Sequence, residues 1–204
     1  MKDLKHIRFF EEMLEQANNK LVQQAKAEGK VAVGYTCYYV PEVLLNCGNA
    51  FSVRLSAPNT GSLDISQYYM TSFICGYSRA LFERAFEGGY NFLDFYASSD
   101  TCQQMVRVVE NFHELKLIDN PRFGYGIIDA PLKVSPHGLK LYPQQINSQF
   151  LEPLSRDYGI DVSDAAIRKA VEEHNEMCEI FEELCELRKA DNPVITPREF
   201  HILS

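Results

Sequence analysis

Four short apolar runs, each followed by a stretch with helical spacing, constrain the fold of this chain more than any other feature. The runs fall at residues 31–36, 50–55, 91–96 and 122–129. Apolar runs of this length that alternate with helices are typical of parallel strands buried between two helical layers. We therefore expect an α/β fold with a small, four-stranded, mainly parallel sheet of the Rossmann or flavodoxin type and helices on both faces.

The stretches between the runs carry the signals of helices. We expect one amphipathic helix from the start of the chain to residue 27, a helix that begins at Pro41, and further helices over residues 71–87 and 101–116. Residues 97–100 are expected to form a loop that leads from the third strand into its helix. That loop would lie at the carboxyl edge of the sheet, where parallel sheets bind their ligands.

The sequence changes character after Pro143, because no further strand pattern occurs. Two helices are expected at residues 144–158 and 164–190, followed by a short last helix. We therefore divide the chain into an α/β domain with an N-terminal helix, residues 1–142, and a helical appendage, residues 143–204, which leads toward a second domain that this sequence lacks.

Charge and composition exclude several classes of partner. The formal net charge is −8, which argues against nucleic acid or an anionic membrane surface. No stretch approaches the ~18 apolar residues of a membrane helix, and the charged start of the chain has no apolar signal segment. We expect a cytoplasmic protein with no nucleic-acid or membrane partner. Since the usual nucleotide-binding loop patterns are absent, we also expect no bound nucleotide.

The six cysteines are the side chains of this sequence with the clearest capacity for metal binding or redox chemistry. No CxxC pair occurs, and in a reducing compartment they are free thiols or metal ligands rather than disulfides. Cys75 falls near the beginning of one expected helix, and Cys102 falls where the third strand turns into the next. Thiolates at helix N-termini can ligate iron, but such cysteines can also pack as small apolar groups. Spacing leaves both interpretations open, whereas Cys178 and Cys185 are expected to pack along a helix.

Longer motifs extend over nearly the whole chain and match one enzyme family in order and separation. They are the segment from Cys37-Tyr38-Tyr39 to Glu42 with its preceding strand, the strand at 48–55, the segment at 75–81, the strand and threonine-cysteine element at 92–105, and the long helix and turn at 162–199. On these segments the chain resembles the N-terminal half of a subunit of the 2-hydroxyacyl-CoA dehydratase family, which includes 2-hydroxyglutaryl-CoA dehydratase D-components and benzoyl-CoA reductase-like subunits.

The resemblance implies an oxygen-sensitive subunit with two α/β domains that hold a [4Fe–4S] cluster through three cysteines. Cys75 and Cys102 match two of these ligands, and the third is implied to lie outside this chain. If both bind one cluster, their sulfurs should lie within roughly 7 Å of each other. Cys37 is expected nearby but pointing elsewhere. The cleft around Tyr38 and Glu42 is implied to face the acyl-CoA substrate, and the catalytic residues are unknown.

The resemblance also implies partners. Two related subunits pair in the family, and a separate ATP-dependent iron–sulfur activator delivers one electron. The electron forms a ketyl radical from (R)-2-hydroxyacyl-CoA, from which water can leave. A chain without its second domain is expected to be incomplete for catalysis. It should expose an apolar face to the missing half or a related subunit and form a dimer or larger complex.

Two departures from the family pattern concern the expected site. Tyr38 stands where many members have a serine beside the substrate, and Gly76 replaces the proline usual after the first ligand cysteine. We expect an iron–sulfur subunit, or a fragment of one, of an enzyme that dehydrates or reduces an acyl-CoA thioester and derives from a lyase. The alternative is a cluster-free, non-catalytic binding or interaction module from the same family. A flavodoxin-like ligand-binding domain outside the family is a third interpretation.

Overall fold

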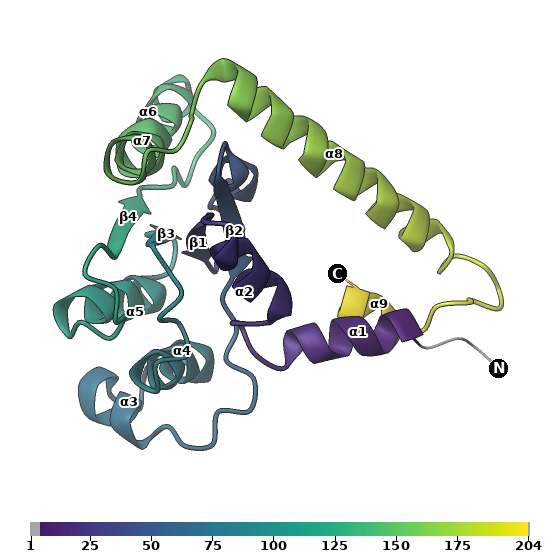
Figure 1. Cartoon of the computed structure of the whole chain (residues 1–204), viewed down its shortest axis with the longest axis horizontal. Helices are drawn as coiled ribbons and strands as arrows, with labels where there is room; N and C mark the ends of the chain where they lie inside the picture. The colour runs from purple at the N-terminus through teal and green to yellow at the C-terminus, as the bar shows by residue number, and fades with distance from the viewer. Residues whose placement is uncertain (1–4, 204) are drawn as a thin grey trace.

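The computed structural model describes residues 5–203, and their four strands form one parallel sheet in the order β2-β1-β3-β4 (Figure 1). The strands are β1 (Val31–Tyr35), β2 (Ala50–Arg54), β3 (Phe95–Ser99) and β4 (Gly124–Ile128). All three neighbouring pairs are parallel, and helices flank the sheet. The expected α/β class with a small parallel sheet is confirmed.

The strand order reverses between β1 and β3. From β1 the chain first crosses to the edge strand β2, and it then returns past β1 to β3 and continues to β4. The connections on the two sides of this point leave in opposite directions, which opens a crevice beyond the carboxyl ends of β1 and β3. The residues that follow Tyr35 and Ser99 line this crevice.

One face of the sheet is covered chiefly by α4 (Gly76–Phe86) and α5 (Gln103–Glu114), with smaller contributions from α2 (Lys20–Ala27) and α3 (Asp64–Met70). The core beneath them is aromatic. The ring of Phe112 lies 6.0 Å from that of Tyr90 and 5.9 Å from that of Tyr96, and all three side chains are fully buried. Burial of each such ring stabilises the fold by roughly 1.5–3 kcal/mol.

The other face is covered by a nearly continuous run of helix: α6 (Pro136–Ile146), the π-helical turn η2 (Asn147–Leu151) and α7 (Glu152–Tyr158). Because Pro153 has no N–H, it cannot donate to the carbonyl of Gln149 in the α-helical pattern. That carbonyl instead approaches β4, and a Cβ built on Gly126 would lie only 2.1 Å from it. Gly126 is therefore required by the close approach of this helix to the sheet.

The last part of the chain leaves the sheet. The long helix α8 (Asp164–Glu186) contacts the short helix η1 (Glu42–Asn46) near its beginning and buries Ala170 there. It then extends past the α/β body, and α9 (Pro197–Leu203) returns to pack on α1 (Lys5–Leu14) (Figure 1). Within residues 5–203, no helix combines the length and apolar character required to cross a membrane.

Three local expectations were wrong. The N-terminal region forms two helices, because Asn19 accepts hydrogen bonds from the N–H groups of Leu21 and Val22 and starts a second helix there. The helix expected from residue 71 begins only at Gly76, as α4, and the additional helix α3 precedes Thr71, which has φ of 65°. The helix expected from residue 144 begins as α6 at Pro136 and contains Pro143.

The position of the third strand was also wrong, and this difference affects the site. Residues 91–94 form a turn held by Asp94, whose Oδ2 accepts from the N–H of Ala32 at 2.8 Å and from Lys26 Nζ at 2.5 Å. The strand therefore begins at Phe95 and includes Ser98 and Ser99. Both serines are buried strand residues instead of loop residues.

Candidate functional site

The two loops that follow β1 and β3 contact each other at this switch point. Cys37 Sγ lies 3.5 Å from Thr101 Oγ1, and this hydroxyl lies 2.8 Å from Ser99 Oγ. Cys37 is thus held beside the residue that immediately precedes Cys102. Cys37 was expected near the site, and in the structure its sulfur contacts the hydroxyl of Thr101.

The environment of Cys37 favours its thiolate. Burial raises the pKa of the Cys37 thiol, but hydrogen bonds from the N–H of Tyr39 and the hydroxyls of Thr101 and Ser99, together with the charge of Arg54, outweigh burial and lower that pKa overall. Cys37 is therefore more nucleophilic and a better metal ligand than an ordinary thiol at neutral pH.

Cys75 occupies the N-cap of α4. Its Sγ accepts from the N–H of Ser78 at 3.4 Å and lies 3.1 Å from Ser78 Oγ. Its own N–H donates to Oε1 of Gln104 in the first turn of α5, at 2.8 Å. The residue itself is exposed, so the thiol is accessible although its backbone is fixed.

Cys102 occupies the corresponding N-cap of α5, is exposed, and makes no side-chain capping bond. Gln104, which bonds Cys75, follows it by two residues. The structure therefore brings the two helix N-termini that carry Cys75 and Cys102 to the same edge of the sheet. The expected separation of their sulfurs stays a prediction. Cys178 and Cys185 lie on α8, where both are half-buried.

Four buried hydroxyl-bearing residues, which we call the polar layer, lie beneath these helix N-termini: Thr36, Ser78, Tyr96 and Ser98. Thr36 Oγ1 and the Tyr96 hydroxyl are 2.8 Å apart, and Ser78 Oγ donates to Met105 Sδ at 3.3 Å. Ser98 is 1% exposed, and its hydroxyl has no hydrogen-bond partner among residues 5–203. No sequence pattern predicted this layer, because Ser98 was expected in a loop.

Tyr38 lies at the mouth of the crevice and is 82% exposed. Arg54, the last residue of β2, donates from Nη1 to the Tyr38 hydroxyl at 2.8 Å, and its Cζ lies 4.5 Å from the centre of the Tyr38 ring. Among residues 5–203 Arg54 forms no ion pair with a carboxylate. Sequence reasoning assigned no role to Arg54, although it belongs to the matched strand motif.

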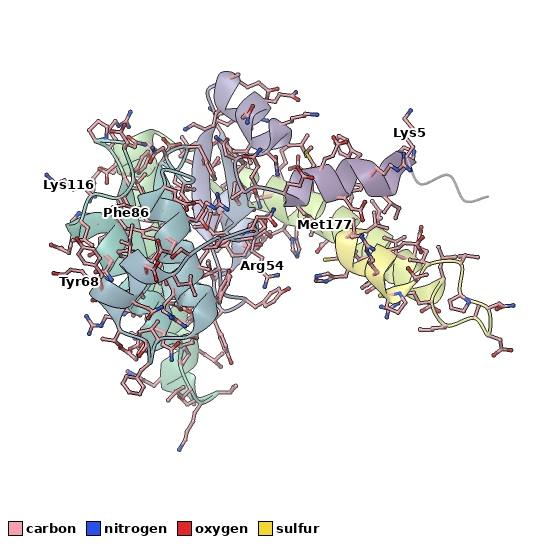
Figure 2. The ribbon with its side chains drawn as sticks, turned by 90° about the horizontal axis from the view of Figure 1, so that it is seen from below. Lys5, Arg54, Tyr68, Phe86, Lys116 and Met177 are labelled. Atoms are coloured by element: carbon pink, nitrogen blue, oxygen red, sulfur yellow. The ribbon has the colours of Figure 1, made fainter. Side chains whose placement is uncertain are left out.

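Glu42 points away from this mouth and toward α8. It accepts from Asn46 Nδ2 and Ser52 Oγ, each at 2.5 Å, and His174 Nδ1 lies 3.4 Å from its second oxygen. Glu42, Asn46 and His174 border a cleft of about 440 Å³ together with Met177, and the residues that line this cleft do not include Tyr38. Figure 2 shows how α8, on which Met177 is labelled, extends past the body that carries Arg54.

Tyr35 connects the two regions. Burial raises the pKa of its hydroxyl to about 12, and the neighbouring Glu42 adds to this shift while Arg54 opposes it. The hydroxyl of half-buried Tyr35 is therefore influenced both by Glu42 and by Arg54, the residue that bonds Tyr38. Tyr38 and Glu42, the two expected substrate-binding residues, are close in sequence, but the structure places them in different environments.

The two accessible thiols are the candidate metal-binding groups of this chain. Across residues 5–203, no three His, Cys, Asp or Glu side chains are grouped so that they could hold a metal ion. Two thiols at adjacent helix N-termini, with an unsatisfied buried hydroxyl in the polar layer beneath them, fit a cluster that takes its remaining ligand from elsewhere. The assignment of Cys75 and Cys102 as cluster ligands stays a prediction.

A parallel α/β domain with thiols at the switch-point edge defines a class of candidate metal or cofactor carriers, and the comparisons with known proteins narrow it. The model of the family "2-hydroxyglutaryl-CoA dehydratase, D-component" matches residues 37–204, so the chain belongs to this family. The resemblance inferred from the sequence motifs is thereby confirmed, and the family is a component of a multi-component dehydratase.

One curated relative is the (R)-phenyllactyl-CoA dehydratase beta subunit of Clostridium sporogenes. It is 25% identical over 194 residues, which cover 92% of this chain and 49% of the relative. The chain therefore spans about half the length of the relative that it matches.

Proposed function

We propose that this chain is an iron–sulfur subunit, or one part of such a subunit, of an enzyme that dehydrates or reduces an acyl-CoA thioester. One observation carries the proposal: two accessible thiols cap adjacent helices at the carboxyl edge of the sheet, and a hydrogen bond from Cys75 to Gln104 connects those helices. The family membership and the name of the relative support an acyl-CoA substrate.

Cys75 and Cys102 would hold a [4Fe–4S] cluster, with a further ligand from outside this chain. When bound, the cluster supplies one-electron transfer to the thioester substrate. Both residues would present their sulfurs from helix N-caps, and the sulfur of Cys75 already accepts a hydrogen bond from the N–H of Ser78. The backbone of Cys75 is fixed through Gln104 before any metal binds.

The substrate side of the site would be formed by Tyr38, Arg54 and Glu42. The Tyr38 ring and the Arg54 guanidinium form an exposed stacked pair beside Cys37, suited to a planar or anionic part of the substrate. Glu42 is held by Asn46 and Ser52, so it can orient a polar group from the cleft beside α8. Tyr38 replaces the smaller serine of many members and narrows this mouth.

The partners of this chain would be a related dehydratase subunit or a second half-domain, together with an ATP-dependent iron–sulfur activator in the cytoplasm. A cluster with two ligands from this chain requires a further donor, which such a partner supplies. The activator would be the electron donor of the cluster.

The proposal is tested by reconstituting the complex of this chain with a related dehydratase subunit, anaerobically and with iron and sulfide, because that partner supplies the further ligand. We expect absorbance near 400 nm and bound iron in the wild-type complex, and loss of one cluster's share of both in Cys75→Ser and in Cys102→Ser. Cys178→Ser on α8 is the matched control and should keep both signals. Equal iron binding in all four proteins, or none in the wild type, contradicts the assignment.

A cluster-free binding module of the same family is the second candidate. It is favoured by one observation: residues 5–203 contain no group of three metal-binding side chains. In this case the wild type stays colourless after reconstitution, including when a related subunit is present. The iron content of the purified complex therefore distinguishes the iron–sulfur subunit from the cluster-free module.

A further inference from the structure

The unsatisfied hydroxyl of Ser98 is the most unusual feature of the polar layer. Thr36 and Tyr96 bond each other, and Ser78 bonds Met105, so every other member of the layer has a partner. Ser98 has none among residues 5–203, although it is 1% exposed. An unpartnered buried hydroxyl destabilises the folded state, and folded proteins rarely leave one in this state.

The direction of the Ser98 side chain follows from the alternation of the strand. Tyr96 packs in the core beneath α4 and α5, whereas Phe95 and Ala97 pack in the core on the opposite face. Side chains two residues apart on a strand share a face. Ser98 therefore points toward α4 and α5, one step closer to the carboxyl edge than Tyr96.

The groups above Ser98 at that edge belong to the helix N-termini. The first turns of α4 and α5 meet there, since Ser78 contacts Met105 and Cys75 bonds Gln104. The buried hydroxyl is thus aimed at the region between the two helices that carry the thiols. Each of these helices has more than two turns, so each has a substantial dipole at this end.

We propose that Ser98 is a positioning residue that donates its hydrogen bond to a sulfur atom of the cluster held by Cys75 and Cys102. This inference rests on the proposed function. A hydrogen bond to a cluster sulfur stabilises the reduced form, which carries one more negative charge, and therefore raises the reduction potential. Without the Ser98 hydroxyl, the one-electron reduction of the cluster becomes less favourable.

Two alanine variants separate this role from a structural one. Ser98→Ala removes the unpartnered hydroxyl, and Ser66→Ala is the matched control. Ser66 is also a fully buried serine, but its hydroxyl donates to the carbonyl of Leu63 at 2.8 Å on α3. Ser66→Ala breaks a bond that the folded chain makes, whereas Ser98→Ala breaks none within residues 5–203.

The first measurement is the melting temperature of the metal-free proteins. Ser98→Ala should melt at or above the wild-type temperature, and Ser66→Ala should melt below it. If Ser98→Ala melts below the wild type to the same extent as Ser66→Ala, the Ser98 hydroxyl has a partner without the cluster. That result overturns the proposal, and it does not depend on metal loading.

The second measurement is a reductive titration with dithionite, followed by electron paramagnetic resonance of the anaerobically reconstituted proteins. Ser98→Ala should have a lower reduction potential than the wild type, and Ser66→Ala should have the wild-type value. Equal potentials in all three proteins overturn the role of Ser98 while the proposed function stands. A wild-type chain that takes up no cluster even in complex with a related dehydratase subunit counts against the proposed function itself, and this inference fails with it.

Discussion

The N–H of Cys75 donates to Oε1 of Gln104 at 2.8 Å, and this bond joins the N-cap of α4 to the first turn of α5. Cys75 and Gln104 are 29 residues apart in the sequence and belong to different helices. The bond connects the backbone that carries one thiol to the helix that begins beside the other. The arrangement exists before a metal binds, so little reorganisation accompanies binding.

Gln104→Ala should therefore weaken metal binding more than it weakens the fold. The lost bond contributes about 0.5–1.5 kcal/mol to stability, but the helices that carry the thiols lose their direct connection. We expect a lower iron content after reconstitution and a small shift in the urea unfolding midpoint. Gln103→Ala, an exposed neighbour in the same turn, should change neither value. A Gln104→Ala protein with wild-type iron content argues against a positioning role.

Asp94 should contribute strongly to stability. Its carboxylate accepts from the Ala32 N–H, from Lys26 Nζ and from Asn120 Nδ2, and thereby fixes the turn that precedes β3. Asp94→Ala leaves the Ala32 N–H and a partly buried ammonium without an acceptor, so we expect a loss of about 1–3 kcal/mol in the free energy of unfolding. Chemical denaturation measures it. Asp119→Ala, an exposed carboxylate, should stay near the wild-type value, and equal losses in both variants would contradict the assignment.

Gly126→Ala tests the close approach of the π-helical turn to the sheet. The new methyl group would lie 2.1 Å from the carbonyl oxygen of Gln149, which is backbone and cannot rotate away. We expect destabilisation of at least about 1–3 kcal/mol, as for overpacked cores. Gly61→Ala is the control, because a Cβ there meets nothing within 4 Å. Thermal unfolding of both variants compares them, and similar midpoints would show that this approach is not tight.

The fold could be predicted because its signals are local. Apolar runs such as 31–36 are recognisable without knowledge of their neighbours, and three of the four expected strands overlap the observed ones closely. The third strand was displaced because Phe92 and Leu93 are apolar but occupy a buried turn. The reason for that turn is the contact between Asp94 and Lys26, which are 68 residues apart. No local pattern reports such a contact.

The candidate site could also be predicted only as far as local sequence signals allow. The sequence located Cys75 and Cys102 near helix N-termini, but their assignment as cluster ligands came from the family resemblance and stays a prediction. The role of Arg54 beside Tyr38 was not, since it depends on which strand lies next to β1. Ser98 was assigned to a loop because the strand was placed too early, and its burial follows only from the correct register. Sequence patterns locate chemical groups along the chain, but contacts across the sheet decide which groups meet.

Cys37 should react with iodoacetamide at a lower pH than an ordinary cysteine. Its pKa is lowered because the hydrogen bonds from Tyr39, Thr101 and Ser99 and the charge of Arg54 together outweigh the opposing effect of burial. A lower pKa means a larger thiolate fraction at neutral pH, and the thiolate is the reactive form. Peptide mass spectrometry of the metal-free protein, alkylated across a pH series, gives the midpoint for each cysteine separately.

Thr101→Val is the variant that tests the cause of this shift. Valine keeps the branched shape of threonine but removes the hydroxyl 3.5 Å from the sulfur of Cys37, so the thiolate loses one donor and the alkylation midpoint of Cys37 should move to higher pH. The midpoint of Cys178 on α8, in the same samples, should stay constant and serves as the internal reference. A Cys37 midpoint that is unchanged in Thr101→Val would assign the lowered pKa to the remaining donors. A wild-type midpoint at or above that of Cys178 would show that burial outweighs all of these donors, and that the crevice does not favour a thiolate.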